Sequence, residues 1–392
     1  MTRRHTPAWL NADRVTIAVF VVFLLTGEAH RLLAGSGLRW AYLLLLSFGV
    51  AYVATPLIGE AARRWGVLDV PHGRKAHREP TPLLGGAAVF LAFSVTVVRN
   101  FSFSEELKGV ALAATLVFAV GLLDDVRALP ARLKLVAQLV AVAILIRHGV
   151  VISFFPATPW GNAAEWALTA LWVVGITNAV NFLDGMDGLA AGMCGLMAIF
   201  FSLAALQNHH DFMVYLALPM VGSCLAFLPY NFRPGRSASI FLGDAGSTFL
   251  GFMMAALGVM GDWAGNHTAR LMVPAIILGV PIFDMTFTTV TRIWSGQVRS
   301  FREWVEYTGR DHFHHRLASL RIGNAGAVAV IWVLTVWLGL SALALKNSSG
   351  LAAVLQVAQA ATVFCLMAFF MVFVPREYLR LEEVLERESE YY

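Results

Sequence analysis

The stretch NAVNFLDGMDGLAAG, residues 178–192, joins two apolar runs that are each long enough to form a membrane-spanning helix. Four polar side chains lie in this short junction: Asn178, Asn181, Asp184 and Asp187. Amides and carboxylates are costly beside hydrocarbon, and ionisable residues in such places commonly serve a function. The junction therefore predicts two helices whose shared end forms part of a polar site.

The whole chain has the composition of an integral membrane protein. It contains 392 residues, of which 58% are hydrophobic and 14% charged, and its mean hydropathy is +0.67. These values exclude a soluble globular domain. We expect an all-α polytopic bundle of about 11–12 transmembrane helices, because runs long enough to cross roughly 30 Å of hydrocarbon recur along the chain. The expected spans are 15–35, 40–59, 83–99, 107–123, 134–148, 166–183, 188–206, 212–230, 240–260, 271–291, 325–345 and 351–374.

Basic residues are concentrated in the loops of one side. Most of the 29 Lys and Arg residues fall in loops that face inward when the N-terminus is inside. Positive residues beside spans are retained in the cytosol, so this asymmetry orients the bundle in the inner (cytoplasmic) membrane. The net charge of +4 adds no indication of nucleic-acid binding.

The chain is expected to divide into four parts. Residues 1–38 form an additional span, 39–345 the main domain, 346–374 a last span and 375–392 a charged tail. The basic start and the apolar run after it also resemble a signal peptide, but no small-x-small cleavage site follows cleanly, which favours an uncleaved helix. The three cysteines form no disulfide or zinc pattern.

Five polar stretches carry the chemically informative residues, and in this topology all five face the cytosol. Unrelated polar residues would divide between the two faces, so their convergence predicts one site at the inner membrane surface. The stretches are GVLDVPHGRKAHREPTPLLGG (66–86), GLLDDVRALPARLKLVAQ (121–138), NAVNFLDGMDGLAAG (178–192), NFRPGRSASIFLGDAGS (231–247) and GRDHFHHRL (309–317).

The residue types in these stretches suit phosphoryl chemistry. Carboxylates are ligands for Mg²⁺ or Mn²⁺, and the lack of thiolate clusters argues against zinc. Arginine, lysine and histidine side chains are donors to phosphate oxygens. The carboxylates are Asp124, Asp125, Asp184, Asp187 and Asp244. The donors are Arg74, Lys75, His77, Lys134, Arg236, His312, His314, His315 and Arg316.

Each motif also has a plainer interpretation. Asp124 and Asp125 do not share a helix face, so they form either a polar helix end or a pair with divided tasks, one at a metal and one behind it. The glycines of 185–188 are compatible with helix packing, and Asn178 and Asn181 with hydrogen bonds to a neighbouring helix. The histidine-rich stretch is compatible with lipid headgroup binding or metal ligation, although its imidazoles favour specific hydrogen bonding.

Together, RKAH with PTPLLGG, DDVRALPARLKLVAQ, NAVNFLDGMDGLA, FLGDAGS and DHFHHRL resemble, in order and spacing, the polyprenyl-phosphate N-acetylhexosamine-1-phosphate transferases. The resemblance covers roughly residues 40–345. That family starts the synthesis of O-antigen lipopolysaccharide, enterobacterial common antigen and teichoic acid linkage units, and includes phospho-N-acetylmuramoyl-pentapeptide transferase. The resemblance implies transfer of a sugar phosphate from a UDP-sugar to polyprenyl phosphate in the membrane, which gives polyprenyl-diphospho-sugar and UMP.

The resemblance also implies individual roles. Asp244 and Asn181 match the family's metal ligands for Mg²⁺, with Mn²⁺ as the alternative. The implied catalytic residues are Asp124, Asp125, Asp184, Lys134 and His314, with Lys134 holding the lipid phosphate; which aspartate acts as base or nucleophile stays open. The implied substrate-binding residues are Arg74, Lys75, His77, Asn178, Asp187, His312, His315 and Arg316, with Asp187 near the uracil.

The histidine motif HFHHRL, residues 312–317, bears on the sugar. It has the form found in the N-acetylglucosamine branch, whereas the peptidoglycan enzyme has three contiguous histidines followed by Phe-Glu. UDP-N-acetylglucosamine is therefore the expected donor, with another UDP-acetamido sugar or UDP-MurNAc-pentapeptide as alternatives. A secondary transporter and a lipid-binding scaffold are alternatives of another class. The oligomeric state is open, with a homodimer as one alternative.

Overall fold

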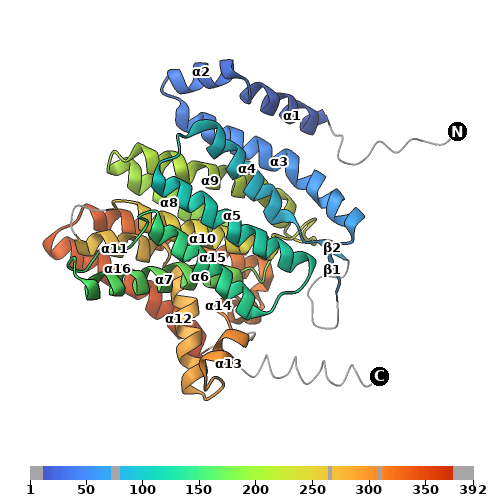
Figure 1. Ribbon diagram of the computed structural model, residues 1–392. Helices are drawn as coiled ribbons and strands as arrows, with labels where there is room; N and C mark the ends of the chain where they lie inside the picture. The colour runs from blue at the N-terminus through green and yellow to red at the C-terminus, as the bar shows by residue number, and fades with distance from the viewer. Residues whose placement is uncertain (1–11, 72–79, 264–266, 308, 310, 374–392) are drawn as a thin grey trace, which may run out of the picture.

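The computed structural model shows a helical bundle and describes residues 12–71, 80–263, 267–307, 309 and 311–373 (Figure 1). The helices are α1 (Ala12–Leu24), α2 (Gly27–Gly35), α3 (Arg39–Trp65), α4 (Gly85–Asn100), α5 (Glu105–Val126), α6 (Ala131–Arg147), α7 (Pro159–Leu183), α8 (Leu189–Gln207), α9 (Asp211–Asn231), α10 (Gly243–Met260), α11 (His267–Ile277), α12 (Gly279–Trp294), α13 (Phe301–Glu306), α14 (Phe313–Leu317), the π-helical turn η1 (Ala318–Ile322), α15 (Gly323–Lys346) and α16 (Gly350–Phe373). Two short antiparallel strands, β1 (Leu68–Asp69) and β2 (Thr81–Pro82), form the only sheet within these ranges.

The expected spans correspond to single helices or to pairs of helices. Among the described residues, eight helices are long and apolar enough to cross a membrane, or ten spans result if each of two bent pairs counts as one. The shorter apolar helix α4 and the helix α6, which carries basic residues near both ends, account for the other expected spans. The prediction of a polytopic all-α membrane protein is confirmed.

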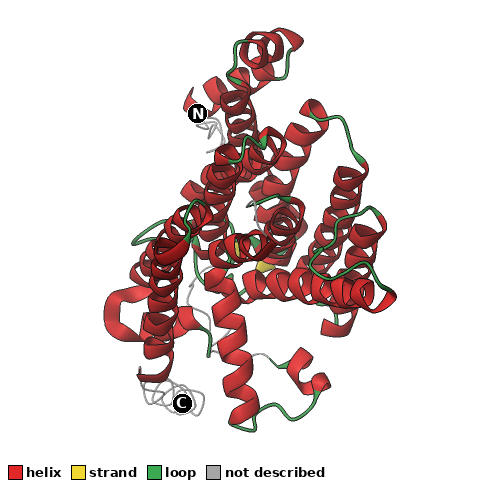
Figure 2. Cartoon of the chain, turned by 90° about the vertical axis from the view of Figure 1, so that its left-hand side faces the viewer, coloured by secondary structure: helices red, strands yellow, loops and turns green. Residues whose placement is uncertain are grey.

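Two of the expected spans, 15–35 and 271–291, are bent. α1 and α2 meet at 77°, and α11 and α12 meet at 80°. At the first bend a new helix begins because the Thr26 hydroxyl caps it, accepting the N–H of Ala29 at 3.2 Å. At the second, Pro281 in the first turn of α12 has no amide hydrogen to donate to the carbonyl of Ile277, so the helical hydrogen bonding is interrupted where α11 ends. As a result α12 extends away from the bundle and leads to α13, as Figures 1 and 2 show.

The central helix of the bundle is α10, the most buried of the candidate spans. Small residues let neighbouring helices approach its first turns closely, as is common for helix packing in membranes. A Cβ atom on Gly86 of α4 would overlap the backbone of Gly246, and one on Gly121 of α5 would lie 2.7 Å from the Cα of Ala245. The N-terminus of α10 is therefore fixed between α4 and α5.

Replacing Gly86 by alanine should destabilise the protein, because the new methyl group would overlap backbone atoms that cannot rotate away. Overpacking of this kind costs typically about 1–3 kcal/mol, so the midpoint of thermal unfolding in detergent should fall. The control is Gly175→Ala in α7, where no described atom outside its own helix turn lies within 4 Å of the added methyl group. Equal midpoints for the two variants would contradict this packing.

Candidate active site

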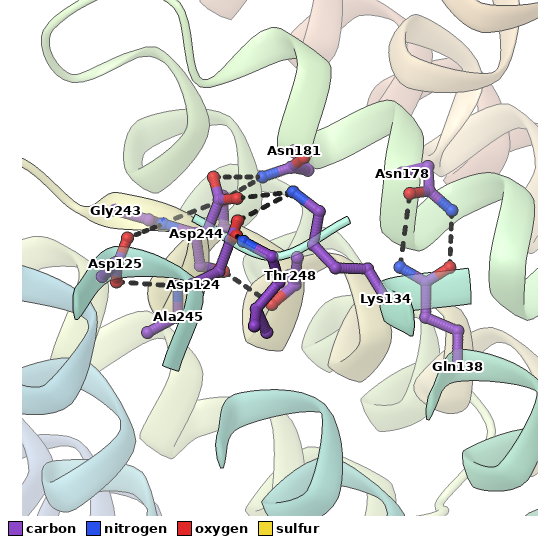
Figure 3. A network of polar contacts seen from close by, with 12 residues as sticks. Asp124, Asp125, Lys134, Gln138, Asn178, Asn181, Gly243, Asp244, Ala245 and Thr248 are labelled. Atoms are coloured by element: carbon purple, nitrogen blue, oxygen red, sulfur yellow. Dashed lines mark hydrogen bonds and ion pairs between the residues drawn. The ribbon is translucent and has the colours of Figure 1, made fainter. Parts of the chain in front are cut away.

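The expected carboxylates and the expected lysine meet at one end of the bundle, where four helices begin or end. Asp124 and Asp125 lie in the last turn of α5, and Lys134 lies in the first turns of α6. Asn181 is near the end of α7, and Asp244 is in the first turn of α10. The side chains of all five converge (Figure 3).

Lys134 bridges two carboxylates from different helices (Figure 3). Its Nζ donates to Oδ2 of Asp124 at 2.8 Å and to Oδ2 of Asp244 at 3.0 Å. Oδ1 of Asp124 also accepts the N–H of Leu129 at 2.6 Å, which fixes this carboxylate to the turn between α5 and α6. The Lys134 and Asp244 side chains are 30% and 33% exposed, against 9% for Asp124. A ligand would therefore reach Lys134 and Asp244 first.

Asp125 has different partners from its neighbour. Its carboxylate accepts the backbone N–H groups of Asp244 at 2.7 Å and of Ala245 at 3.1 Å. N–H groups in the first turn of a helix have no acceptor within the helix, and a carboxylate there is also favoured by the helix dipole. Gly243, with φ of +74°, permits the close approach, since a Cβ would lie 2.6 Å from Oδ2 of Asp125. Asp125 thus holds Asp244 in place.

The expected metal ligands lie side by side. Nδ2 of Asn181 donates to Oδ1 of Asp244 at 3.0 Å and to the Ser247 hydroxyl at 2.8 Å. No group of three or more His, Cys, Asp or Glu side chains in the described chain could hold a metal by itself. Mg²⁺ is usually bound by one or two carboxylates with substrate phosphates and water. Asp244 therefore suits an ion that arrives with a diphosphate, and Asn181 would join it with its amide turned so that Oδ1 rather than Nδ2 faces Asp244.

Asn178 points toward α6 rather than toward Asp244 (Figure 3). Its Nδ2 donates to Oε1 of Gln138 at 2.7 Å, and its Oδ1 accepts from Nε2 of Gln138 at 3.2 Å. This reciprocal amide pair fastens α6, which carries Lys134, to α7, which carries Asn181. The observed contact is the helix–helix hydrogen bond that was one interpretation of the sequence, and substrate binding by Asn178 stays a prediction.

The loop between α7 and α8 forms the neighbouring part of the site. Oδ2 of Asp187 accepts the N–H of Ala238 at 3.1 Å, and the N–H of Gly188 donates to Oδ1 of Asn231 at 2.7 Å. These bonds tie the loop to the segment that leads into α10 and to the end of α9, respectively. The loop and the carboxylate cluster are therefore held as one unit.

Two titratable side chains, Asp184 and His314, lie at this loop. Burial of the carboxyl group, reinforced by nearby carboxylates, raises the pKa of Asp184 well above its ordinary value. Burial, followed by the neighbouring histidines, lowers the pKa of His314 well below its ordinary value of 6.5. Neither ring nitrogen of His314 has a hydrogen-bond partner among the described atoms, and a Cβ on Gly185 would lie 2.5 Å from Nε2. Such an unsatisfied buried group is typical of a ligand site.

The other expected residues are less fully described. His315 lies beside His314, with ring centroids 4.0 Å apart, while His312 and Arg316 are buried. Arg74, Lys75 and His77 lie outside the described residues. The roles assigned to all of these residues stay predictions.

Sequence reasoning missed Asp284, Arg292 and Asp311. Asp284 is fully buried in α12, and Arg292 on the same helix is paired with Asp311. A lone carboxylate inside the apolar run 271–291 was the available signal, because ionisable residues in spans are rare and commonly functional.

Comparison with known proteins gives the family. Residues 107–262 match the sequence model for "Glycosyl transferase family 4". The "Probable undecaprenyl-phosphate N-acetylglucosaminyl 1-phosphate transferase" of Bacillus subtilis (strain 168) is 33% identical over 311 residues, 78% of this chain and 84% of the relative. The "Decaprenyl-phosphate N-acetylglucosaminephosphotransferase" of Mycobacterium leprae (strain TN) is 34% identical over 330 residues, 75% of this chain and 79% of the relative. The "Phospho-N-acetylmuramoyl-pentapeptide-transferase" of Heliobacterium modesticaldum (strain ATCC 51547 / Ice1) is 32% identical over 282 residues, 65% of this chain and 82% of the relative.

The helical membrane bundle, together with the matching family and relatives, defines this chain as a membrane-embedded transferase. The chain belongs to glycosyl transferase family 4, among the polyprenyl-phosphate sugar-1-phosphate transferases. The resemblance predicted from the motifs is therefore confirmed.

The depressed pKa of His314 predicts a loss of stability in acid. Below pH 6.5 the unfolded chain takes up a proton at this histidine while the folded chain does not, so the free energy of unfolding falls by about 1.4 kcal/mol per pH unit. From pH 7.5 to 5.5 the midpoint of thermal unfolding should therefore shift in a more destabilising direction in the wild type than in His314→Gln. The raised pKa of Asp184 changes the free energy of unfolding with pH in the opposite direction, but it does so equally in the wild type and in the variant. The control is His209→Gln at an exposed position, and a slope that His314→Gln changes no more than this control does would refute this account.

Proposed function

We propose that this protein transfers N-acetylglucosamine 1-phosphate from UDP-N-acetylglucosamine to a polyprenyl phosphate and releases UMP, as the membrane step that starts a cell-surface glycan. The observation that carries the proposal is the contact of Lys134 with both Asp124 and Asp244 within the matched region. The names of the Bacillus and Mycobacterium relatives support the donor sugar and the class of lipid carrier.

The chemical problem is the meeting of two anions. An oxygen of the lipid phosphate forms a bond to the phosphorus that bears the sugar, and the bond from that phosphorus to the UMP oxygen breaks. A phosphate monoester has a second pKa near ~6, so much of the acceptor is dianionic at neutral pH and a strong general base is not required. The partly exposed ammonium of Lys134 is suited to hold the lipid phosphate, and Asp124 orients that ammonium.

Asp244 and Asn181 would hold a Mg²⁺ ion, with Mn²⁺ as the alternative. When bound, the ion would screen the charge of the diphosphate and stabilise the charge that develops on the departing UMP. Asp125 contributes by accepting the first N–H groups of α10, which keeps the Asp244 carboxylate oriented. The task of Asp125 in this proposal is support of the ligand rather than contact with it.

The donor is proposed to bind along the loop between α7 and α8. His314 offers unpaired ring nitrogens there, and Asp184 with its raised pKa is suited to donate a hydrogen bond as the protonated acid. His315 and Arg316 extend the same side of the pocket, and Asp187 is proposed to lie near the uracil. UDP-MurNAc-pentapeptide and other UDP-acetamido sugars are alternative donors, which a substrate panel separates.

The proposal includes an orientation in the inner membrane with the site facing the cytosol. Arg63 and Arg64 end α3 beside the short sheet, and Arg127 and Arg132 flank the turn between α5 and α6, at the same end as the site. Positive residues beside spans favour the cytosolic side, where a nucleotide sugar is found. A homodimer stays a prediction.

The first experiment measures UMP release by purified protein with polyprenyl phosphate, Mg²⁺ and a panel of UDP-sugars. Wild type should release UMP from UDP-N-acetylglucosamine only when lipid and Mg²⁺ are present. Asp244→Ala should lose about 10²–10³-fold or more in rate, because it removes a proposed ligand of the ion that would stabilise the developing charge. Asp262→Ala, beyond the opposite end of α10, should remain active. A folded wild-type protein that releases no UMP from any donor would overturn the proposal.

Lys134 gives a second test. Lys134→Met should abolish most activity and raise the apparent KM for polyprenyl phosphate, since it leaves two facing carboxylates where the lipid phosphate must bind. Lys134→Arg retains the charge and should retain part of the activity. The control is Lys108→Met at the other end of α5, where the lysine pairs only with exposed Glu105 among the contacts described. Comparable KM values for Lys134→Met and wild type would exclude this role.

A further inference from the structure

A buried polar network connects α12 to the segment that carries His314. Asp284 lies fully buried in α12, and the proposed reaction makes no use of it. Its Oδ2 lies 2.7 Å from Nδ1 of His312, and its Oδ1 accepts the N–H of Phe313 at 2.6 Å. A buried carboxylate is tolerated only when it is hydrogen-bonded. Both oxygens of Asp284 are therefore committed to two consecutive residues of the histidine motif.

His312 has both ring nitrogens engaged within the protein. Nη2 of Arg292 lies 3.3 Å from Nε2 of His312, and an arginine can only donate. Nε2 must therefore accept, which places the ring proton on Nδ1, directed at Asp284. The ring of Phe182 stacks on that of His312 with centroids 5.3 Å apart, and His312 is only 4% exposed. In the described structure His312 has no ring nitrogen left for a ligand.

Arg292 is itself held in one position. Its Nε donates to Oδ2 of Asp311 at 2.8 Å and its Nη2 donates to Oδ1 at 2.6 Å, and its guanidinium lies 4.4 Å from the ring centre of Tyr307. Asp284 and Arg292 are eight residues apart and therefore share a face of α12, together with buried Thr288. This face fixes the residues on the N-terminal side of α14 at several points.

The anchored residues determine where His314 lies. The carbonyl of His312 accepts the N–H groups of His315 at 3.1 Å and Arg316 at 3.4 Å, so His312 begins α14. His314 follows within that first turn and packs on Gly185. A shift of His312 would thus move the unpaired imidazole of His314 away from the loop between α7 and α8.

We propose that Asp284 is a positioning residue for the transfer reaction: through His312 and the Phe313 amide it fixes the start of α14, and so holds His314 against the donor pocket. His312 serves in this arrangement as a link between Asp284 and α14, which differs from the substrate contact implied by the resemblance. The inference rests on the proposed function for the activity it affects, and on the contacts of α12 for the positioning itself.

Asp284→Asn tests the anchor with little change of volume. If the asparagine Oδ1 keeps the Phe313 bond, its NH₂ group faces Nδ1 of His312. Nδ1 must then accept, so the ring proton moves to Nε2. There it faces the N–H of Arg292, and two donors oppose each other. Loss of a supporting contact behind a metal ligand typically costs about 10–100-fold in activity, and we expect a loss of that order here. We expect that loss in kcat/KM for the UDP-sugar, with an unchanged KM for polyprenyl phosphate. The matched control Asp262→Asn should behave as wild type. Unchanged kcat/KM in Asp284→Asn would overturn the proposal.

His312 variants separate a link from a substrate ligand even if Asp284→Asn folds poorly. The amide Nδ2 of His312→Asn lies near the position of Nδ1 and can still donate to Asp284, but it cannot replace Nε2. His312→Asn should therefore retain most activity, whereas His312→Ala should lose as much as Asp284→Asn. Equal loss in His312→Asn and His312→Ala would show that the bond to Asp284 is not what His312 contributes and would overturn the proposed link.

A measurement without turnover keeps the two proposals distinguishable. In ¹⁵N-histidine-labelled protein in detergent, the resonance that His312→Asn removes should report a ring protonated on Nδ1, and Asp284→Asn should change that state. If the wild type released no UMP but showed this signature, the proposed function would fail while the anchor stood. A wild-type His312 protonated on Nε2 would reject the anchor whatever the activity.

Discussion

The ammonium of Lys134 lies between two carboxylates from different helices, and the rest of the site depends on this contact. Without it, Asp124 and Asp244 would face each other across a partly buried space, where like charges strongly disfavour simultaneous ionisation. The three groups come from α5, α6 and α10, so one cation holds three helix ends together. Because the ammonium and Asp244 are partly exposed, a phosphate oxygen can replace a carboxylate oxygen as the acceptor of the ammonium.

Residues that orient the side chains of the site also accept hydrogen bonds from backbone groups at helix ends. Asp125 accepts N–H groups at the start of α10 that have no partner within the helix, and this requirement of any helix end also orients Asp244. Gly86 and Gly121 remove the side chains that would separate α10 from its neighbours. The polar groups of the cluster lie at helix ends rather than in mid-span, where desolvation would be more costly.

The spans and the convergence of the motifs could be predicted because both depend on local sequence: apolar length gives the helices, and the distribution of basic residues predicts their orientation. The family resemblance extended this to Asp124, Lys134, Asp244 and Asn181, which the structure brings together. Pairings across the fold could not be predicted. Asn178 meets Gln138 across 40 residues and Asp284 meets His312 across 28, and no local pattern specifies such partners. The two bends were not predicted, because the apolar length of a run does not distinguish a straight helix from a bent one.

The position of Asp284 also has a consequence for biogenesis. Its partners, the His312 ring and the Phe313 amide, both follow it in the chain, so during synthesis the apolar segment of α12 is made before the groups that hydrogen-bond its carboxylate. A carboxylate at the centre of a span costs about 2.5–3.5 kcal/mol on insertion scales. The hydrogen bonds that offset this cost can form only once the chain has been made as far as residue 313, so the histidine motif contributes to the membrane fold as well as to the pocket.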